Sequence, residues 1–151
     1  MKAVIQRVTN ASVEVEGNVV GSCNKGYMIL LGAHESDTLS DVETLANKVV
    51  NLRVFSDEDD KMNKSILDVD GEILAISQFT LCANVKKGNR PSFIEAMKPD
   101  TAHEMYELFC KKLLELGVKR VEKGIFGADM KVSLVNDGPV TIIYDTEIWR
   151  K

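Results

Sequence analysis

Residues 130–144 read MKVSLVNDGPVTIIY and place Asn136-Asp137-Gly138-Pro139 between two strand-like runs. Apolar and polar side chains alternate before the run, and β-branched residues are frequent after it, so both flanks predict strands. Asp-Gly between such flanks is a strong β-hairpin signal. The proline adds a feature, because an X-Pro bond adopts the cis form at a cost of only roughly 0.5–1 kcal/mol. The segment predicts either an ordinary hairpin tip or one that aims backbone carbonyls outward in a fixed direction.

Further strands are predicted in the N-terminal third. Val13 and Val15 alternate with glutamates, and Gly17-Asn18 is suited to a two-residue hairpin loop into the next strand. Tyr27 to Leu31 is a continuous apolar run, which is typical of a strand buried on both faces.

A strand is also predicted from Glu72 to Leu81, where an apolar first half leads into Ser77-Gln78-Phe79-Thr80. Because strand side chains alternate, Ser77 and Phe79 are expected on one face and Gln78 and Thr80 on the other. Polar residues at the end of a buried strand often border a pocket. A strand that frays into a polar loop explains the same pattern.

Two helices are predicted by capping boxes that precede apolar residues at helical spacing. The first box is Ser40-x-x-Glu43, and the second is Thr101-x-x-Glu104, directly after Pro99-Asp100. Gly117 is suited to the C′ position after the second helix. The apolar stripe of that helix, which we expect to face the core, comprises Tyr106, Phe109, Leu113 and Leu116. His103 lies off this stripe and is predicted to be on the surface.

The order of the elements indicates the fold class. Strands come first and are followed by a helix, strands, a second helix and more strands, which is typical of an α+β fold. We expect a mostly antiparallel β-sheet that curls towards a barrel, with two helices packed on it. At 151 residues the chain predicts a single domain, residues 1–151, that is long enough to bury a core.

Composition and charge exclude several classes of protein. With 44% hydrophobic and 28% charged residues, neither disorder nor a membrane protein is indicated, and no apolar run approaches the ~20 residues of a spanning helix. The N-terminus has no apolar signal region, and three cysteines without a C-x-x-C motif predict a reduced, cytoplasmic location. A net charge of −4 excludes nucleic-acid binding driven by bulk electrostatics, although a small footprint on an RNA end stays open.

No side-chain nucleophile with a matching base is evident. His34 and His103 form neither a His-x-x-His nor a His-Glu-x-x-His pair, so we expect no metal site and no cofactor. No spacing pairs a cysteine with a histidine, and the cysteines are interpreted as small buried hydrophobic residues. Ser77 and Thr80 are the better hydroxyl candidates.

Two loops carry residues suited to a nucleotide. Lys86-Lys87 and Arg90 lie in one loop, where a phosphate contact competes with the simpler interpretation of a solvated surface. Residues 124–130, GIFGADM, combine glycines with Phe126 and Met130, against which an adenine could stack. Each signal is weak by itself.

Taken together, these segments resemble the motifs of the D-aminoacyl-tRNA deacylases. SQFTL at 77–81 and NDGPVT at 136–141 are similar to the two signature motifs of that family. Further similar segments are KGNRPSF at 87–93, FGADM at 126–130, KMN at 61–63, QRV at 6–8 and ASV at 11–13. The resemblance runs the length of the chain, and the chain length and the order of the motifs agree.

The resemblance implies an enzyme that hydrolyses the ester between a D-amino acid, or glycine mischarged on tRNA-Ala, and the 3′ end of tRNA. Such an enzyme proofreads chirality in translation. The resemblance also implies a homodimer, in which Gly138-Pro139, with a cis bond, reaches from one subunit into the pocket of the other. There it would hold the substrate amino group and exclude L side chains, and Arg7 would help to orient it.

The resemblance further implies how the pocket works. Ser77, Gln78, Phe79 and Thr80 would line it, with backbone N–H groups near Phe79 and Thr80 polarising the ester carbonyl. Phe126 and Met130 would lie near the terminal adenosine, and Lys86 would add a substrate contact. The ribose 2′-hydroxyl would assist the attack, so no side-chain nucleophile is needed.

Two alternatives stay open on the sequence. One is a non-enzymatic module that binds RNA 3′ ends or nucleotides, and the other is a Thr- or Cys-dependent hydrolase of small esters. The module would cleave nothing, and the small-ester hydrolase would ignore either the chirality or the tRNA.

Overall fold

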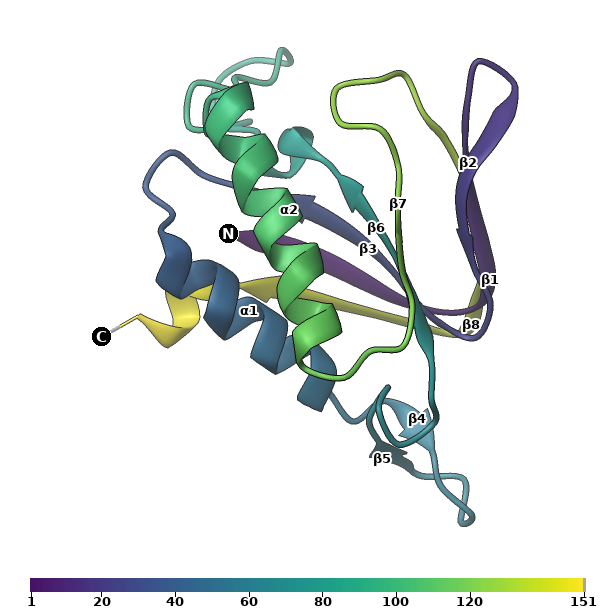
Figure 1. Cartoon of the computed structure of the whole chain (residues 1–151). Helices are drawn as coiled ribbons and strands as arrows, with labels where there is room; N and C mark the ends of the chain where they lie inside the picture. The colour runs from purple at the N-terminus through teal and green to yellow at the C-terminus, as the bar shows by residue number, and fades with distance from the viewer. Residues whose placement is uncertain (151) are drawn as a thin grey trace.

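The computed structural model describes residues 1–150 and has two helices packed on the same face of a β-sheet (Figure 1). The helices are α1 (Leu39–Asn51) and α2 (Pro99–Glu115). The main sheet comprises β1 (Lys2–Val15), β2 (Asn18–Cys23), β3 (Gly26–Gly32), β6 (Glu72–Ser77), β7 (Val121–Lys123) and β8 (Lys131–Asp145). The remaining elements are the pair β4 (Phe55–Ser56) and β5 (Met62–Lys64) and the 3-10 helices η1 (Phe79–Cys82) and η2 (Thr146–Trp149). Lys151, the last residue of the predicted domain, lies outside the described residues.

The main sheet is nearly closed into a barrel. Its order is β2-β1-β3-β6-β7, and β8 pairs with β1 along most of that strand. β1 is antiparallel to β2, β3 and β8, whereas β3-β6 and β6-β7 are parallel pairs. β2 returns so close to β7 that a Cβ added at Gly21 would collide with the carbonyl oxygen of Lys123. The predicted α+β fold with a mostly antiparallel, curled sheet is confirmed.

Alternation along the strands divides the buried side chains between two cores. Ile5 of β1 faces the helices, where the larger core includes Leu45 of α1 and Phe109 of α2. Residues of the opposite parity, such as Val8 and Leu74, form a smaller core inside the barrel. The apolar stripe predicted for α2 therefore faces the core as expected.

Residues 130–144 do not form the predicted hairpin. β8 continues through them as one strand, because both of its halves pair with β1. Thr141 pairs with Gln6 and Asn136 with Val8, so residues 137–140 lie opposite the single β1 residue between those partners. Residues 137–139 are exposed and bulge out of the strand, and the Gly138-Pro139 bond is cis. Asp-Gly correctly indicates a break in the hydrogen-bonded ladder. Its two flanks, however, pair with β1, a strand distant in sequence, and not with each other.

Both helices begin before the predicted capping boxes. The box of α1 is Thr38-x-x-Asp41, in which the Thr38 amide donates to the Asp41 carboxylate at 2.8 Å. Ser40 therefore lies inside the first turn. α2 begins at Pro99 instead of Thr101, because the fixed φ of proline and its missing N–H suit the first helical position. Gly117, with a φ of 111°, follows α2 as predicted.

Two strand ends also differ from the prediction. The loop between β1 and β2 is Glu16-Gly17, with φ values of 51° and 80°, and Asn18 is already paired with Val15. β6 ends at Ser77, and the chain enters η1 two residues later. The alternation expected over residues 77–80 is therefore wrong, because a 3-10 helix does not alternate its side chains between two faces.

Candidate functional site

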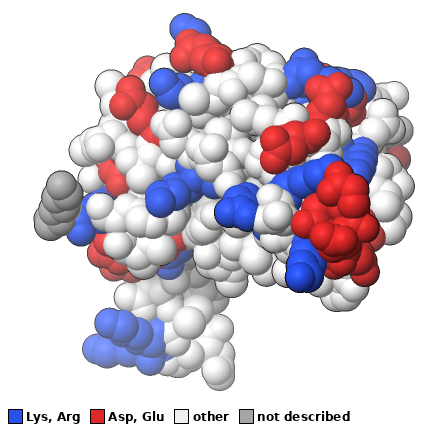
Figure 2. All heavy atoms as spheres, turned by 90° about the horizontal axis from the view of Figure 1, so that it is seen from below, with Lys and Arg blue, Asp and Glu red and all other residues white. Residues whose placement is uncertain are grey.

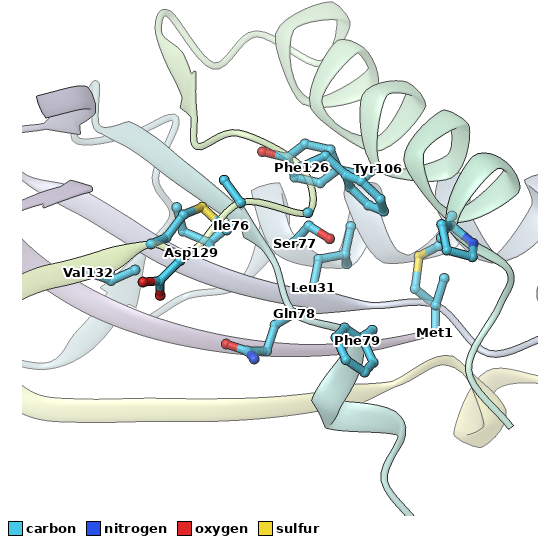
Figure 3. Close-up of a pocket in the computed structure, with 16 residues that line it drawn as sticks. Met1, Leu31, Ile76, Ser77, Gln78, Phe79, Tyr106, Phe126, Asp129 and Val132 are labelled. Atoms are coloured by element: carbon cyan, nitrogen blue, oxygen red, sulfur yellow. The ribbon is translucent and has the colours of Figure 1, made fainter. Parts of the chain in front are cut away.

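A cavity of about 350 Å³ opens where the end of β6, the first half of α2 and the loop between β7 and β8 meet (Figure 3). Ser77, Gln78 and Asp129 are its polar residues, and most of the remaining wall is apolar. The apolar wall includes Leu31 and Ile76 from the sheet, Ala102 and Tyr106 from α2, and Phe126 and Met130 from the loop. The structure thus brings together the strand end and the glycine-containing loop that the sequence indicated separately.

Ser77, Gln78 and Phe79 all border the cavity because β6 gives way to η1 at this point. The backbone N–H of Gln78 donates to the carbonyl oxygen of Leu31 at 2.7 Å, and this hydrogen bond fixes the chain against β3. Phe79 is 55% exposed, and its ring packs edge-on against Phe93 with centroids 5.1 Å apart. An exposed phenylalanine at a cavity rim leaves apolar surface for a ligand or a partner to cover.

The backbone amides of Phe79 and Thr80 open η1. The first N–H groups of a helix have no partner inside it. Within residues 1–150, no hydrogen bond runs from either amide to another protein oxygen. The Thr80 hydroxyl accepts a hydrogen bond from the Gln78 side chain, and Thr80 itself does not line the cavity. Phe79 lines the cavity, so its unpaired backbone amide is more available to a bound group than the Thr80 side chain.

Phe126 forms the aromatic wall of the cavity. Its ring lies parallel to that of His103, with centroids 4.6 Å apart and an interplanar angle of 7°. On the cavity side Tyr106 is tilted against it at 6.2 Å (Figure 3). The Tyr106 hydroxyl donates to the carbonyl oxygen of Ala75 at 2.6 Å, and burial raises its pKa. This hydroxyl is therefore neutral and engaged in the core.

Arg7 holds the bulge of β8. Its Nε donates to the carbonyl oxygen of Asp137 at 3.1 Å, and its Nη1 donates to that of Val54. The Arg7 side chain is only 12% exposed, so its position is well defined by its surroundings. Neither Arg7 nor Gly138 and Pro139 line the cavity of their own chain. The structure therefore separates these three predicted residues from the pocket residues.

Lys86 borders a different hollow, which is polar and also contains His34, Glu95 and Arg150. Its loop is closed by two backbone hydrogen bonds between Asn84 and Ser92, at 2.8 and 2.9 Å. Figure 2, which views the molecule from below, shows Lys and Arg side chains interspersed with Asp and Glu on that face, without one continuous basic surface. Lys86 is thus not part of the cavity that Phe126 lines.

One close pair of potentially reactive side chains was not expected from the sequence. The Cys82 Sγ lies 3.6 Å from Nδ1 of His34. Burial, and after it the charge of Asp37, raise the pKa of this thiol, and a protonated thiol is a poor nucleophile. Neither residue of the pair lines the cavity. All three cysteines are free and buried, as interpreted from the sequence.

Metal-ligating side chains do not cluster in the described part of the chain. Residues 1–150 contain no group of three or more His, Cys, Asp or Glu side chains that could hold a metal ion. Likewise, no helix among these residues is long and apolar enough to cross a membrane.

Two residues near the cavity were not predicted from the sequence. His103 was expected only on the surface, yet it supports Phe126 from outside. Its position three residues before Tyr106 was the available signal, since such residues are neighbours on a helix. Asp129 lines the cavity mouth and pairs with Lys131 at 3.1 Å. It belongs to the FGADM segment, in which the aromatic ring and the methionine give the stronger signal for a nucleotide.

The chain resembles one family of proteins along nearly its whole length. The family described as D-Tyr-tRNA(Tyr) deacylase matches residues 4–145. D-aminoacyl-tRNA deacylases of Sulfurihydrogenibium sp. and Bacteroides thetaiotaomicron are 58% and 56% identical over 147 residues, which cover 97% of this chain and 99% and 98% of theirs. A solved structure of the c-Myc DNA Unwinding Element Binding Protein is 44% identical, with a TM-score of 0.91 over 96% of this chain and 98% of that one. A probable eukaryotic D-amino acid tRNA deacylase, 17% identical over 95% of this chain and 97% of that one, shares the fold with a TM-score of 0.79.

Proposed function

The chain belongs to the D-Tyr-tRNA(Tyr) deacylase family and is a hydrolase of D-aminoacyl-tRNA, and from this premise we propose how its own residues carry out and select that reaction. A water oxygen adds to the ester carbonyl carbon, the bond from that carbon to the ribose 3′ oxygen breaks, and the 3′ oxygen leaves with a proton. The products are the free D-amino acid and the tRNA.

The ester carbonyl binds at the start of η1. The observation that carries this assignment is the pair of free amides of Phe79 and Thr80 beside a cavity with one aromatic wall. Preorganised backbone donors of this kind stabilise a developing oxyanion, and removing one such donor typically costs about 10²–10³ in kcat. Ser77 and Gln78 line the site, and the terminal adenosine lies against Phe126 and Met130.

The substrate supplies the base. Next to η1 the cavity is lined by Ser77, Gln78 and Phe79, none of which carries a carboxylate, imidazole or amine, and the Thr80 hydroxyl oxygen accepts a hydrogen bond from the Gln78 side chain. The ribose 2′-hydroxyl is held next to the ester, and intramolecular positioning can contribute about 7–11 kcal/mol at best. A tRNA that ends in 2′-deoxyadenosine and is charged on its 3′ oxygen should therefore bind but be cleaved far more slowly. Full activity on this substrate, together with an inactive Thr80→Ala variant, would instead make Thr80 the nucleophile.

Chiral selection comes from a second copy of the chain. Gly138-Pro139 is exposed, is held by Arg7 and does not line the cavity of its own chain, which supports its insertion into the cavity of a partner subunit. In the partner's cavity the carbonyl oxygens of this bulge accept hydrogen bonds from the substrate ammonium group and leave no room for an L side chain. Glycine on tRNA-Ala, which has no side chain, is accepted. We propose the cytoplasm as the location, because three free cysteines suit a reducing compartment.

The test is deacylation of matched D-, L- and glycyl-tRNA substrates by purified protein. We expect cleavage of the D and glycyl esters and rejection of the L ester. No cleavage of any ester would favour a non-enzymatic module that binds RNA ends. Equal cleavage of D and L esters, or of a small ester without tRNA, would favour a general esterase.

A further inference from the structure

The loop between β7 and β8 supplies one wall of the cavity through residues 126–130. Its backbone makes one internal turn, with the Ala128 amide 3.1 Å from the carbonyl oxygen of Ile125. Gly127 adopts a φ of 79°, a conformation that favours glycine. A loop with so little internal hydrogen bonding takes its position from contacts with its neighbours.

α2 supplies two of these contacts from its exposed side. His103 stacks flat on the outer face of Phe126, at 4.6 Å, and its side chain is 52% exposed. Glu107, one turn later, contacts Nε2 of His103 at 3.4 Å and Nζ of Lys123 at 2.7 Å. Lys123 is the last residue of β7, so the contacts fix both the start and the middle of the loop.

Glu107 and Lys123 form an ion pair. A hydrogen bond from Lys123 lowers the pKa of the Glu107 carboxyl, so this group is ionised at neutral pH. The carboxylate can then accept hydrogen bonds from Lys123 and from His103 together. His103 itself does not line the cavity, and its Nε2 contacts Glu107.

We propose that His103 is a positioning residue for the substrate nucleoside, acting by stacking on Phe126 and holding this ring as the wall against which the terminal base packs. The inference rests on the proposed function in one respect, namely that the base lies against Phe126. Because the base is remote from the ester, the contact stabilises the bound substrate and the transition state equally. Loss of His103 should then raise KM and leave kcat unchanged.

Three variants of one position separate the stack from the hydrogen bond. His103→Ala removes both, His103→Gln keeps a donor for Glu107 without the ring, and His103→Phe keeps the ring without the donor. Glu104→Ala is the matched control, because Glu104 is the exposed residue next to His103 in the same helix.

The first measurement is amide hydrogen exchange over residues 124–130 in the free protein. We expect exchange about two- to tenfold faster in His103→Ala and His103→Gln, which is the range for an aromatic pair worth ~0.5–1.5 kcal/mol at about 1.4 kcal/mol per tenfold. His103→Phe and Glu104→Ala should exchange like the wild type. The second measurement is steady-state deacylation of D-aminoacyl-tRNA, in which KM should rise over the same range in the Ala and Gln variants at unchanged kcat.

Unchanged exchange in His103→Ala would overturn the proposal. So would a His103→Phe variant that behaves like Ala while Gln behaves like wild type, because the hydrogen bond to Glu107 would then be the important contact. The exchange measurement needs no substrate. A wild-type protein that fails to cleave D-aminoacyl-tRNA would therefore refute the proposed function, while the exchange comparison would still decide whether His103 holds the loop.

Discussion

Tyr106 is a single side chain that serves the core and the cavity together. Its ring packs in the larger core and also borders the cavity, while its hydroxyl is bound to the Ala75 carbonyl oxygen of β6. Burial raises the pKa of this hydroxyl, so the group cannot act as a base near neutral pH. Tyr106 therefore fixes the distance between α2 and the strand that ends in the site.

Cys82 lies close to a histidine, as a nucleophilic cysteine would, but its thiol is not activated, and we therefore expect it to be dispensable for catalysis. Its Sγ lies near His34, but burial raises the pKa of the thiol and the pair is outside the cavity. Cys82→Ala should keep deacylation within a few-fold of the wild type, and EDTA should have no effect on the rate. Steady-state kinetics of variant and wild type, with and without EDTA, provide the measurement. A loss of more than about a hundredfold, roughly 2.7 kcal/mol, would identify Cys82 as part of the chemistry.

At the scale of the elements, local signals and long-range pairing contribute differently. The alternation of β1, the apolar run of β3 and the stripe of α2 depend on periodicity alone, and the structure confirms them. β8 could not be predicted as one strand, because local residues do not reveal that β1 receives both of its halves. The end of β6 was missed for a similar reason, since η1 continues a sequence that is also compatible with a strand.

In the candidate site, too, some features follow from local sequence and others from long-range packing. Ser77, Gln78 and Phe79 are adjacent in sequence and stay together in the cavity, and Phe126 joins them from a distant loop. Lys86 is close to them in sequence but faces another hollow. The bulge of β8 lies outside the cavity altogether. Which loops meet depends on how α2 and the sheet pack, and that packing cannot be read from the spacing of motifs.

The bulge of β8 is the element most sensitive to a small substitution. Gly138 has a φ of 129°, and a Cβ added there would lie 2.8 Å from Cγ2 of Val140 and 3.0 Å from Nη2 of Arg7. Gly138→Ala should therefore displace both the bulge and the arginine that holds it. We expect deacylation of D-aminoacyl-tRNA to fall by at least about tenfold, or 1.4 kcal/mol, and the D over L ratio to narrow.

The matched control for this variant is Gly17→Ala in the loop between β1 and β2. Gly17 also has a positive φ, 80°, but an added Cβ would contact nothing within 4 Å. Both variants place an L residue at a positive φ, which costs about 1–3 kcal/mol, and only Gly138→Ala adds close contacts of the new Cβ. Thermal unfolding shows whether each variant is folded. Wild-type chiral discrimination in a folded Gly138→Ala protein would show that the bulge is not the filter.

At the scale of the whole molecule, the sheet lacks a cover around β8. Both helices lie on the same side (Figure 1), and on the other side Ile143 of β8 is 71% exposed. Val135, on the other flank of the bulge, is 52% exposed. Among residues 1–150, no strand pairs with the second edge of β8. Exposed apolar residues beside an unpaired edge and a protruding bulge are what a second copy of the chain could cover.

A homodimer with composite sites makes a prediction about mixtures of two defective chains. Ala128→Trp would fill the cavity and leave the bulge intact, whereas Gly138→Ala would distort the bulge and leave the cavity open. Each homodimer should be nearly inactive. In a mixed dimer, the bulge of the first chain enters the open cavity of the second, which restores one of two sites. Random pairing makes half of the dimers mixed, so a 1:1 mixture that is unfolded and refolded together should recover about one quarter of the wild-type activity.

The mixing experiment distinguishes a composite site from mere dimerisation. If each subunit completed its own site, both chains of a mixed dimer would stay defective, and the mixture would show only the mean of its two components. Light scattering of the wild type adds the second condition, because a stable pair buries about 1,200 Å² or more in total. A monomer at working concentration that still cleaves D-aminoacyl-tRNA with full chiral discrimination would contradict the arrangement. The bulge of β8 would then need a route into the cavity of its own chain, although Arg7 holds it outside that cavity.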